Sequence, residues 1–255
     1  MKGTILITGA SSGIGKEIAI VYASKHYNLI LVARSKEKLD ILKINLENKY
    51  QIEITNIYLD LSEQNSAEEL YKIVKEKALQ VDILINNAGF GLNGNFIDID
   101  INSQAEMLNL NILTLTKLSN LFAKEMILQN SGHIVNIAST AAFQPVSKFA
   151  VYAATKAYVL SFSEAISVEL KAENIKVTVI CPGATESNFM DNAGIKKISL
   201  LSLASSKQVA EFTYKSVSKA RVVAIHGFLN RFLVFFTRFT PRSIIRNISG
   251  KFFDD

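Results

Sequence analysis

The sequence predicts a doubly wound α/β fold, in which about seven parallel strands carry helices on both faces and a C-terminal helical extension follows. Two observations lead to this prediction. Seven short runs rich in Val, Ile and Leu alternate with longer segments of helical period, and the runs are apolar on nearly every residue, as strands buried on both faces require. In addition, 49% of the 255 residues are hydrophobic and 20% are charged, so one domain can bury a large core.

The expected elements follow in chain order. The strands are Thr4–Thr8, Asn28–Ala33, Glu53–Leu59, Val81–Asn86, His133–Ala138, Lys176–Cys181 and Val222–Ile225. The helices are Gly13–Lys25, Lys36–Lys49, Glu63–Ala78, Asn102–Gln129, Tyr152–Glu173 and Lys207–Lys219. Such sustained alternation implies right-handed crossovers, and ligands of such sheets bind at the carboxyl ends of the strands. We find no internal repeat or linker and predict a single domain over residues 1–255, with a substrate-side region at 186–206 and an amphipathic extension at 228–255.

Composition excludes several classes of protein. The net charge of +5 does not by itself imply nucleic-acid binding, and none is expected. The single cysteine, Cys181, allows no intrachain disulfide and favours a reducing compartment. The first residues already resemble a strand, so we expect no signal peptide and a cytoplasmic protein. The three histidines have no metal-ligand spacing, and no metal is expected.

A glycine-rich turn, Thr8-Gly9-Ala10-Ser11-Ser12-Gly13-Ile14-Gly15, follows the first expected strand and opens the first helix. Glycine lets backbone amides approach a pyrophosphate closely, and the helix N-terminus adds partial positive charge. A turn without a ligand is the alternative, but its position between strand and helix favours a dinucleotide site in a Rossmann fold. The expected contacts are Gly9, Ser11, Ser12, Gly13, Ile14 and Gly15.

The end of the second expected strand bears on the choice of cofactor. In dinucleotide folds an acidic residue near this point binds the ribose hydroxyl of NAD, whereas an arginine accommodates the 2′-phosphate of NADP. Ala33 supplies no carboxylate, and the Arg34 guanidinium that follows can bind a phosphate through two hydrogen bonds. The sequence therefore favours NADP(H), the alternative being that Arg34 is an ordinary surface charge.

Tyr152 and Lys156 are one helical turn apart and share a helix face. We expect the nearby ammonium to lower the pKa of the phenol, which suits Tyr152 to general acid–base catalysis. Ser139 follows the fifth expected strand, where its hydroxyl can bind a substrate oxygen. Taken singly, these are weak signals, because such a pair or a loop serine is common.

Asparagines supply two further signals. Asn86-Asn87-Ala88-Gly89 follows the fourth expected strand, and small residues and amides there suit a strand end that lies against a nucleotide. Asn111 lies inside the long expected helix, where asparagine is unfavourable, so a specific hydrogen bond is expected. Asn102 and Asn109 compete for that role, and the pattern alone does not choose among them.

Taken together and in this order, these motifs resemble the short-chain dehydrogenase/reductase family, in its core NADP-preferring group of members of about this length. The resemblance covers about residues 3–190. It implies that Tyr152 is the acid or base and that Ser139 steadies the substrate oxygen. It further implies that Lys156 lowers the tyrosine pKa and holds the nicotinamide ribose, and that Asn111 supports a water-linked proton relay. It also implies an NADPH-dependent oxidoreductase that interconverts a carbonyl and an alcohol, as a homodimer or homotetramer.

The same resemblance assigns the rest of the cofactor site. Asp60 would contact the adenine and Asn87 the adjacent ribose, while Pro182, Gly183 and Thr185 or Ser187 would hold the nicotinamide end. Leu61, Ala88 and Gly89 are further expected cofactor contacts. The chain departs from the family pattern at two positions. Ser187 stands where the family often has threonine, and Ser12 stands where some NADP-using members carry a basic residue, so the NADP prediction depends mainly on Arg34.

Apolar residues flank the catalytic motifs and precede the chain end. If Phe90, Phe143, Phe149, Phe189 and Met190 line the pocket, the substrate is largely apolar; the alternative is that some are core aromatics.

After residue 228, phenylalanines alternate with arginines up to Pro241, and isoleucines then recur at helical spacing. This tail could lie on an anionic membrane surface, but we favour a helical pair that covers the pocket or packs on a neighbouring subunit. Two other functions stay open: a non-catalytic NADP-binding redox sensor and a membrane-peripheral reductase of lipid carbonyls.

Overall fold

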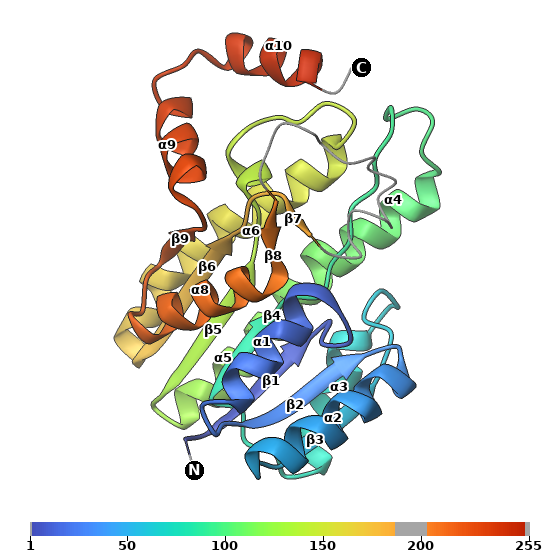
Figure 1. Ribbon diagram of the computed structural model, residues 1–255, viewed down its shortest axis with the longest axis vertical. Helices are drawn as coiled ribbons and strands as arrows, with labels where there is room; N and C mark the ends of the chain where they lie inside the picture. Colours follow the sequence, from blue (N-terminus) through green and yellow to red (C-terminus); the bar gives the residue numbers. More distant parts are fainter. Residues whose placement is uncertain (1, 187–202, 253–255) are drawn as a thin grey trace.

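The computed structural model describes residues 2–186 and 203–252, and within these residues seven parallel strands form the central sheet. Their order is β3-β2-β1-β4-β5-β6-β9 (Figure 1). The strands are β1 Thr4–Thr8, β2 Asn28–Ala33, β3 Ile54–Tyr58, β4 Ile83–Asn86, β5 Gly132–Ile137, β6 Ile175–Cys181 and β9 Val223–Ile225. The chain starts in the middle of the sheet, builds to one edge and returns to build to the other. The direction reverses between β1 and β4, where doubly wound sheets bind ligands.

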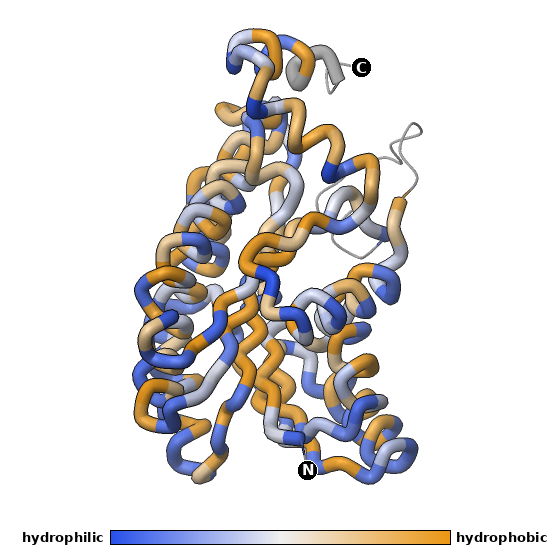
Figure 2. Tube along the Cα trace, turned by 90° about the vertical axis from the view of Figure 1, so that its left-hand side faces the viewer, coloured by the Kyte–Doolittle hydropathy of each residue, from blue (hydrophilic) through white to orange (hydrophobic). Residues whose placement is uncertain are grey.

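Helices cover both faces of this sheet. The helices α1 Gly13–Ala23, α2 Lys36–Tyr50 and α8 Ser206–Ser218 pack on one face, and α3 Ser66–Glu76, α5 Leu115–Leu128 and α6 Ala150–Glu169 pack on the other. Successive residues of β1 enter opposite cores, since Ile5 and Ile7 pack toward α1 and Leu6 toward α3 and α5. This alternation explains why the strands are continuously apolar, as the tube of Figure 2 shows. The predicted fold class is confirmed.

The long helix expected at Asn102–Gln129 is three segments. α4 (Ile101–Leu108) leads into a π-helical segment, Asn109–Thr114, before α5 begins. A π-helical turn accommodates an extra residue and re-aims the side chains around it, and such turns often occur at functional sites. Asn111 lies in this segment, so its poor helix propensity coincides with the irregularity.

The other differences are at the ends of elements. The helix expected from Tyr152 begins two residues earlier, at Ala150, and its last turn is a 3₁₀ segment, Leu170–Glu173. Two short strands that the sequence did not indicate, β7 Thr185–Glu186 and β8 Ala204–Ser205, pair in parallel beside the main sheet. The C-terminal extension forms α9 (Phe228–Thr237) and α10 (Arg242–Phe252), which lie at the top of Figure 1. Among the described helices, none is long and apolar enough to cross a membrane.

Candidate active site

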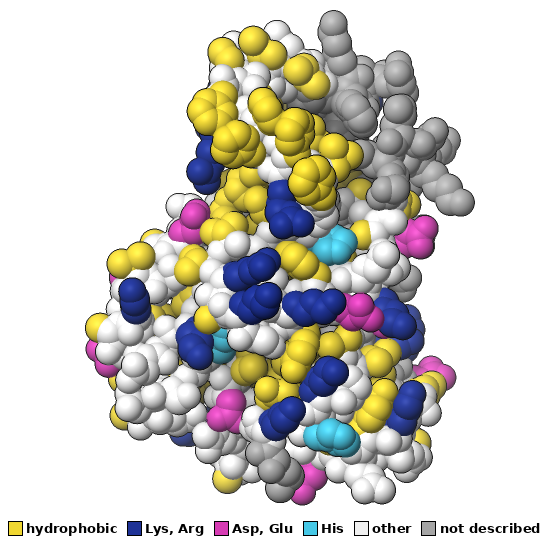
Figure 3. All heavy atoms as spheres, turned by 60° about the vertical axis from the view of Figure 1, so that its left-hand side comes forward, with side chains coloured by type: hydrophobic (Ala, Val, Ile, Leu, Met, Phe, Trp, Pro, Cys, Tyr) yellow, Lys and Arg dark blue, Asp and Glu magenta, His cyan; other side chains and the backbone are white. Residues whose placement is uncertain are grey.

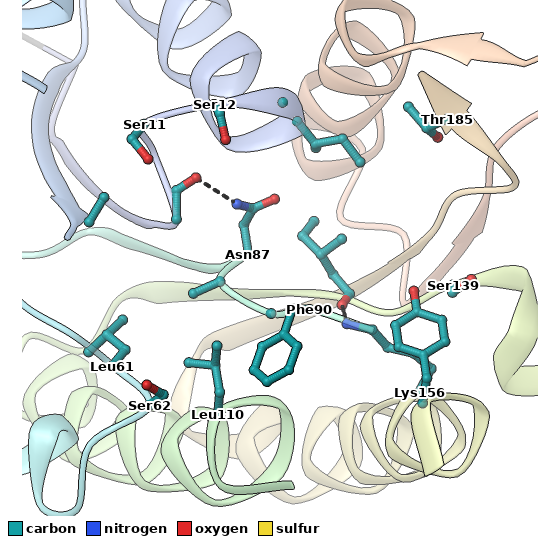
Figure 4. Close-up of a pocket in the computed structure, with 18 of the residues that line it drawn as sticks. Ser11, Ser12, Leu61, Ser62, Asn87, Phe90, Leu110, Ser139, Lys156 and Thr185 are labelled. Carbon is teal, nitrogen blue, oxygen red and sulfur yellow. Dashed lines mark hydrogen bonds between the residues drawn. The ribbon is translucent and has the colours of Figure 1, made fainter. Parts of the chain in front are cut away.

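An open cavity of about 820 Å³ runs along the carboxyl ends of the strands. Figure 4 shows Ser11 and Ser12 at one wall, Leu61 and Ser62 at one end, and Ser139 and Lys156 at the other. The predicted site residues that line it are Gly9, Ser11, Ser12, Gly13, Ile14, Arg34, Asp60, Leu61, Asn87, Ala88, Gly89, Phe90, Ser139, Phe149, Tyr152, Lys156, Pro182, Gly183 and Thr185. Residues from all parts of the sheet edge therefore meet in one elongated cavity.

The glycine turn needs glycine at specific points. Gly9 and Gly13 have φ values of 67° and 52°, a region that disfavours other residues. A Cβ on Gly9 would lie 2.9 Å from the Ala88 Cα atom, and one on Gly15 would collide with the carbonyl oxygen of Gly9. The turn is thus packed tightly against the end of β4, and its backbone faces the cavity.

Hydrogen bonds lock this turn to β4, and they include a residue that the sequence reasoning missed. The Thr8 hydroxyl accepts hydrogen bonds from the Asn87 and Ala88 amides, both at 3.0 Å, and the Asn87 side-chain amide donates to the carbonyl oxygens of Thr8 and Gly9 at 2.9 and 3.2 Å. In this structure Asn87 therefore holds the turn in place. A threonine at the end of a strand is too common a feature to have identified Thr8 from the sequence.

Arg34 lies at the rim of the cavity. Its side chain is 76% exposed, and its Nη1 atom lies 3.3 Å from the Asp60 Oδ2 atom. Burial alone would raise the pKa of Asp60, but hydrogen bonds from Ser62 and the nearby guanidinium outweigh it and hold that pKa below its usual value. The arginine is anchored on one side only, so most of its donors face solvent beside the cavity.

Ser139, Tyr152 and Lys156 converge at the other end. The Tyr152 phenol is hydrogen-bonded to Ser139. The buried Lys156 ammonium donates to the Ile137 carbonyl oxygen at 2.9 Å and lies 5.7 Å from the centroid of the Tyr152 ring. The buried ring of Phe149 packs edge-on against Tyr152, with centroids 6.1 Å apart.

The pKa of Tyr152 differs from the expectation. Burial raises it to about 12, and the hydrogen bond with Ser139 lowers it only in part. Burial also lowers the pKa of Lys156 to about 8. That Lys156 lowers the tyrosine pKa stays a prediction: in this structure the ammonium bonds a backbone carbonyl, and desolvation has the largest influence on the pKa of the phenol.

Asn111 lies behind the cavity wall and does not line it. Its side-chain Nδ2 atom donates to the Phe90 carbonyl oxygen at 2.9 Å and to the Thr155 hydroxyl at 3.1 Å, while its Oδ1 atom accepts from the Phe90 amide at 3.2 Å. Thr155, a second residue that the sequence reasoning missed, in turn donates to the Tyr152 carbonyl oxygen at 2.7 Å. Asn111 therefore ties a cavity wall to the helical turn that carries Tyr152 and Lys156.

The three competing asparagines are now distinguished. Asn109 donates to the Ser62 carbonyl oxygen at 2.6 Å, and Asn102 is exposed on α4. Only Asn111, of these three, touches elements of the catalytic end. The water-linked relay assigned to it stays a prediction.

The predicted substrate residues divide into three groups. Phe90 and Phe149 line the cavity, together with Leu110 and Val146, which the sequence reasoning did not single out. Phe143 was assigned wrongly to the cavity, because it packs against the core cluster that contains Val159. Phe189 and Met190, like Ser187, lie outside the described residues.

Comparisons with known proteins agree with this geometry. A family model described as short chain dehydrogenase matches residues 3–199. An uncharacterized oxidoreductase of Staphylococcus saprophyticus is 34% identical over 183 residues, which cover 71% of this chain and 78% of that protein. An NADP-dependent 3-hydroxy acid dehydrogenase of Schizosaccharomyces pombe is 31% identical over 215 residues, which cover 84% and 80%.

Two solved structures are also similar. A short-chain dehydrogenase from Sphingobium yanoikuyae in complex with NADPH has a TM-score of 0.85 and 30% identity, covering 92% of this chain and 93% of that one. A bulky-bulky ketone specific alcohol dehydrogenase from Comamonas testosteroni has a TM-score of 0.80 and 31% identity, covering 92% and 91%.

Proposed function

The chain belongs to the short-chain dehydrogenase/reductase family, and from that premise we propose that this oxidoreductase uses NADPH to reduce an apolar ketone, with Tyr152 as the proton donor. The observation that carries the proposal is the convergence of Ser139, Tyr152 and Lys156 at one end of a cavity whose other end is the glycine turn. Each residue alone is unremarkable, but an acid, a hydrogen-bond donor and a cation in one cavity form a carbonyl-reducing set.

NADP(H) fits the cavity. The backbone of residues 11–15 would hold the pyrophosphate, because this turn borders the cavity and opens α1, whose N-terminus attracts anions. The turn keeps this shape only with glycine at positions 9 and 15, where an added Cβ would collide with neighbouring backbone. Arg34 would turn from Asp60 to the 2′-phosphate, which its exposure permits. The adenine end would meet Asp60 and Leu61, the adjacent ribose Asn87, Ala88 and Gly89, and the nicotinamide end Tyr152, Lys156, Pro182, Gly183 and Thr185. A relative named NADP-dependent and a similar structure with NADPH support this choice.

The proton chemistry follows from the pKa values. When bound, the nicotinamide supplies a hydride to the carbonyl carbon. Tyr152 stays protonated at neutral pH because its pKa is about 12, so it can donate its phenolic proton to the substrate oxygen. The Ser139 hydroxyl stabilises the same oxygen as it gains negative charge. Lys156 is largely charged below its pKa of about 8 and stabilises the phenolate that Tyr152 leaves behind.

The cavity walls support an apolar substrate. Phe90, Leu110, Val146 and Phe149 line the cavity, and Phe149 packs against Tyr152 at its catalytic end. An apolar lining of this kind favours hydrocarbon substituents on the carbonyl over charged ones. The similarity to an alcohol dehydrogenase named for bulky-bulky ketones points in the same direction.

The test is NADPH oxidation with a panel of aryl and branched alkyl ketones, for the intact chain and for Tyr152→Phe. Loss of the general acid should lower kcat by roughly 10²- to 10⁴-fold, while the Kd for NADPH stays the same. Tyr158→Phe is the matched control, because this tyrosine lies on the same helix but its hydroxyl bonds Thr116 at the surface. It should leave kcat unchanged.

Two outcomes would contradict the proposal. If Tyr152→Phe turned over ketones like the intact chain, Tyr152 would not be the acid. If the intact chain bound NADPH but reduced no carbonyl in the panel, the result would favour a non-catalytic NADP-binding redox sensor over a reductase.

A further inference from the structure

α9 exposes an apolar face that points away from the protein. Seven of its residues or immediate neighbours are between 47% and 79% exposed. This aromatic face consists of Phe228, Leu229, Phe232, Leu233, Phe235, Phe236 and Phe239. Figure 3 shows hydrophobic side chains gathered in its upper part, where α9 and α10 lie in Figure 1. Isolated exposed apolar residues are ordinary, but a contiguous patch marks an interaction surface.

The orientation of α9 makes this exposure a property of the fold. Val234 is the helix's buried residue, and the Asn230 amide donates to the His226 carbonyl oxygen at the base of the helix. With about 3.6 residues per turn, the aromatic face spans an arc of roughly 160° on the side opposite to Val234. A surface helix normally turns its apolar side inward; α9 turns it outward.

The segment of chain that carries this face is basic. Between Glu211 and Asp254 the sequence contains no acidic residue and eight basic ones. These are Lys215, Lys219, Arg221, Arg231, Arg238, Arg242, Arg246 and Lys251. Arg231 and Arg238 flank the aromatic face on α9. On α10, Arg242 and Arg246 are spaced by one turn, as are the exposed Ile244 and Ile248.

We propose that α9 and α10 dock this protein on the surface of an anionic lipid bilayer. Rings at an interfacial helix bury in the acyl boundary, while arginines beside them bind lipid phosphates, and each basic residue near an anionic surface adds to the attraction. The aromatic face with its basic flanks has both components. The proposal does not depend on the reaction proposed above.

Charge argues against a second copy of the chain as the occupant. In a two-fold contact the same patch meets itself, so Arg231 and Arg238 would face the same cations, with no carboxylate between residues 212 and 253 to compensate. A bilayer that contains anionic lipids neutralises these charges instead.

The predicted role of this tail as a cover for the catalytic pocket also loses support. Phe228 and Leu229 border a separate cavity of about 580 Å³ between α8 and α9, and no described residue of α9 lines the catalytic cavity. Asn230 nevertheless lies against Gly183, which does line the catalytic cavity. The docking face is therefore at the same end of the molecule as the site.

The test is flotation of the full chain with two kinds of vesicle: pure phosphatidylcholine, and equal parts of phosphatidylcholine and phosphatidylglycerol. We expect flotation with the anionic vesicles only, and its loss at high salt. Phe232→Ser with Phe236→Ser should weaken partitioning on the order of tenfold per ring. Replacing Arg231, Arg238, Arg242 and Arg246 by glutamine should weaken it on the order of a thousandfold.

Matched controls separate docking from general effects. Leu128→Ser removes an apolar residue that is 82% exposed at the end of α5, and glutamines at Lys49, Lys72, Lys77 and Lys171 remove the same net charge elsewhere on the surface. Both controls should float like the intact chain, and unchanged Kd values for NADPH show that all variants are folded.

Three results would overturn the proposal: no flotation with anionic vesicles, equal flotation with both kinds of vesicle, or unchanged flotation of the arginine variant. A fourth would replace it. If the intact chain did not float but was a dimer by light scattering, and the double serine variant were a monomer, the aromatic face would be a subunit contact.

Discussion

Asn111→Ala tests whether hydrogen bonds from the π-helical segment hold α6, the helix that carries Tyr152 and Lys156, in position. The substitution removes three hydrogen bonds, two to the Phe90 backbone and one to the Thr155 hydroxyl. A buried polar group that loses its partner costs about 1–3 kcal/mol. Thr155 keeps its bond to the Tyr152 carbonyl oxygen, and Phe90 is only partly buried. We therefore expect the free energy of unfolding to fall by about 2–4 kcal/mol, which lowers Tm by roughly 5–15 °C in a chain of this size.

Thermal unfolding and kinetics together measure this effect. At a temperature where the variant is fully folded, kcat should still fall, because Tyr152 is no longer held by the Asn111–Thr155 connection, while the Kd for NADPH should not change. Asn109→Ala is the matched control: its amide lies in the same segment but bonds Ser62 at the half-exposed surface, so it should cost about 1 kcal/mol and leave kcat intact. Equal effects of the two substitutions on Tm and kcat would refute the argument.

Three further predictions concern the cofactor and the proton. Arg34→Gln should weaken NADPH binding by roughly ten- to a hundredfold through the loss of charged hydrogen bonds and leave NADH binding unchanged; equal losses for both would contradict the assignment of Arg34. The kcat/KM for ketone reduction should be flat at acid pH and fall as pH rises through about 8, where Lys156 loses its proton while Tyr152 keeps its own until about 12; a profile still flat at about pH 9 would count against the ammonium. Gly15→Ala must displace the Gly9 carbonyl and should weaken NADPH binding at least about tenfold. Gly132→Ala instead crowds the buried Met126 side chain, away from the cavity lining, and should lower stability without changing NADPH binding.

The fold, the glycine turn and the Tyr152–Lys156 pair were predictable because their signals are local, whereas the rest of the cavity lining was implied by the family resemblance. A strand buried on both faces must be apolar at every residue, and the glycine turn must have glycine where φ is positive, as at Gly9 and Gly13. Tyr152 and Lys156 share a face simply because they are four residues apart on a helix. These local rules do not predict which residue, distant in the sequence, each side chain contacts in the folded protein.

Thr8, Thr155 and Phe143 illustrate that limit. Thr8 meets Asn87 from another strand end, and Thr155 meets Asn111 from another helix; in both cases the partner is tens of residues away in the sequence. Phe143 flanks a catalytic motif in the chain, yet it packs into the core beside Val159. The rule that ligands bind at strand ends, together with the family resemblance, therefore indicated which motifs meet, but not which way each side chain points.

Long-range packing also decides two properties that the sequence does not predict: the pKa values of Tyr152 and Lys156, and the direction in which the apolar side of α9 faces. The Tyr152–Lys156 spacing puts a cation beside a phenol, but the sign of the pKa shift depends on how much water both groups lose, and that depends on packing by residues such as Phe149. The periodicity of α9 likewise shows an amphipathic helix, but only the burial of Val234 reveals that the apolar side faces outward. The desolvated ammonium of Lys156 and the exposed rings of α9 are therefore properties of the packing, which the sequence pattern does not contain. The first feature belongs to the proposed cofactor site, and the second belongs to the proposed docking of α9 on a bilayer.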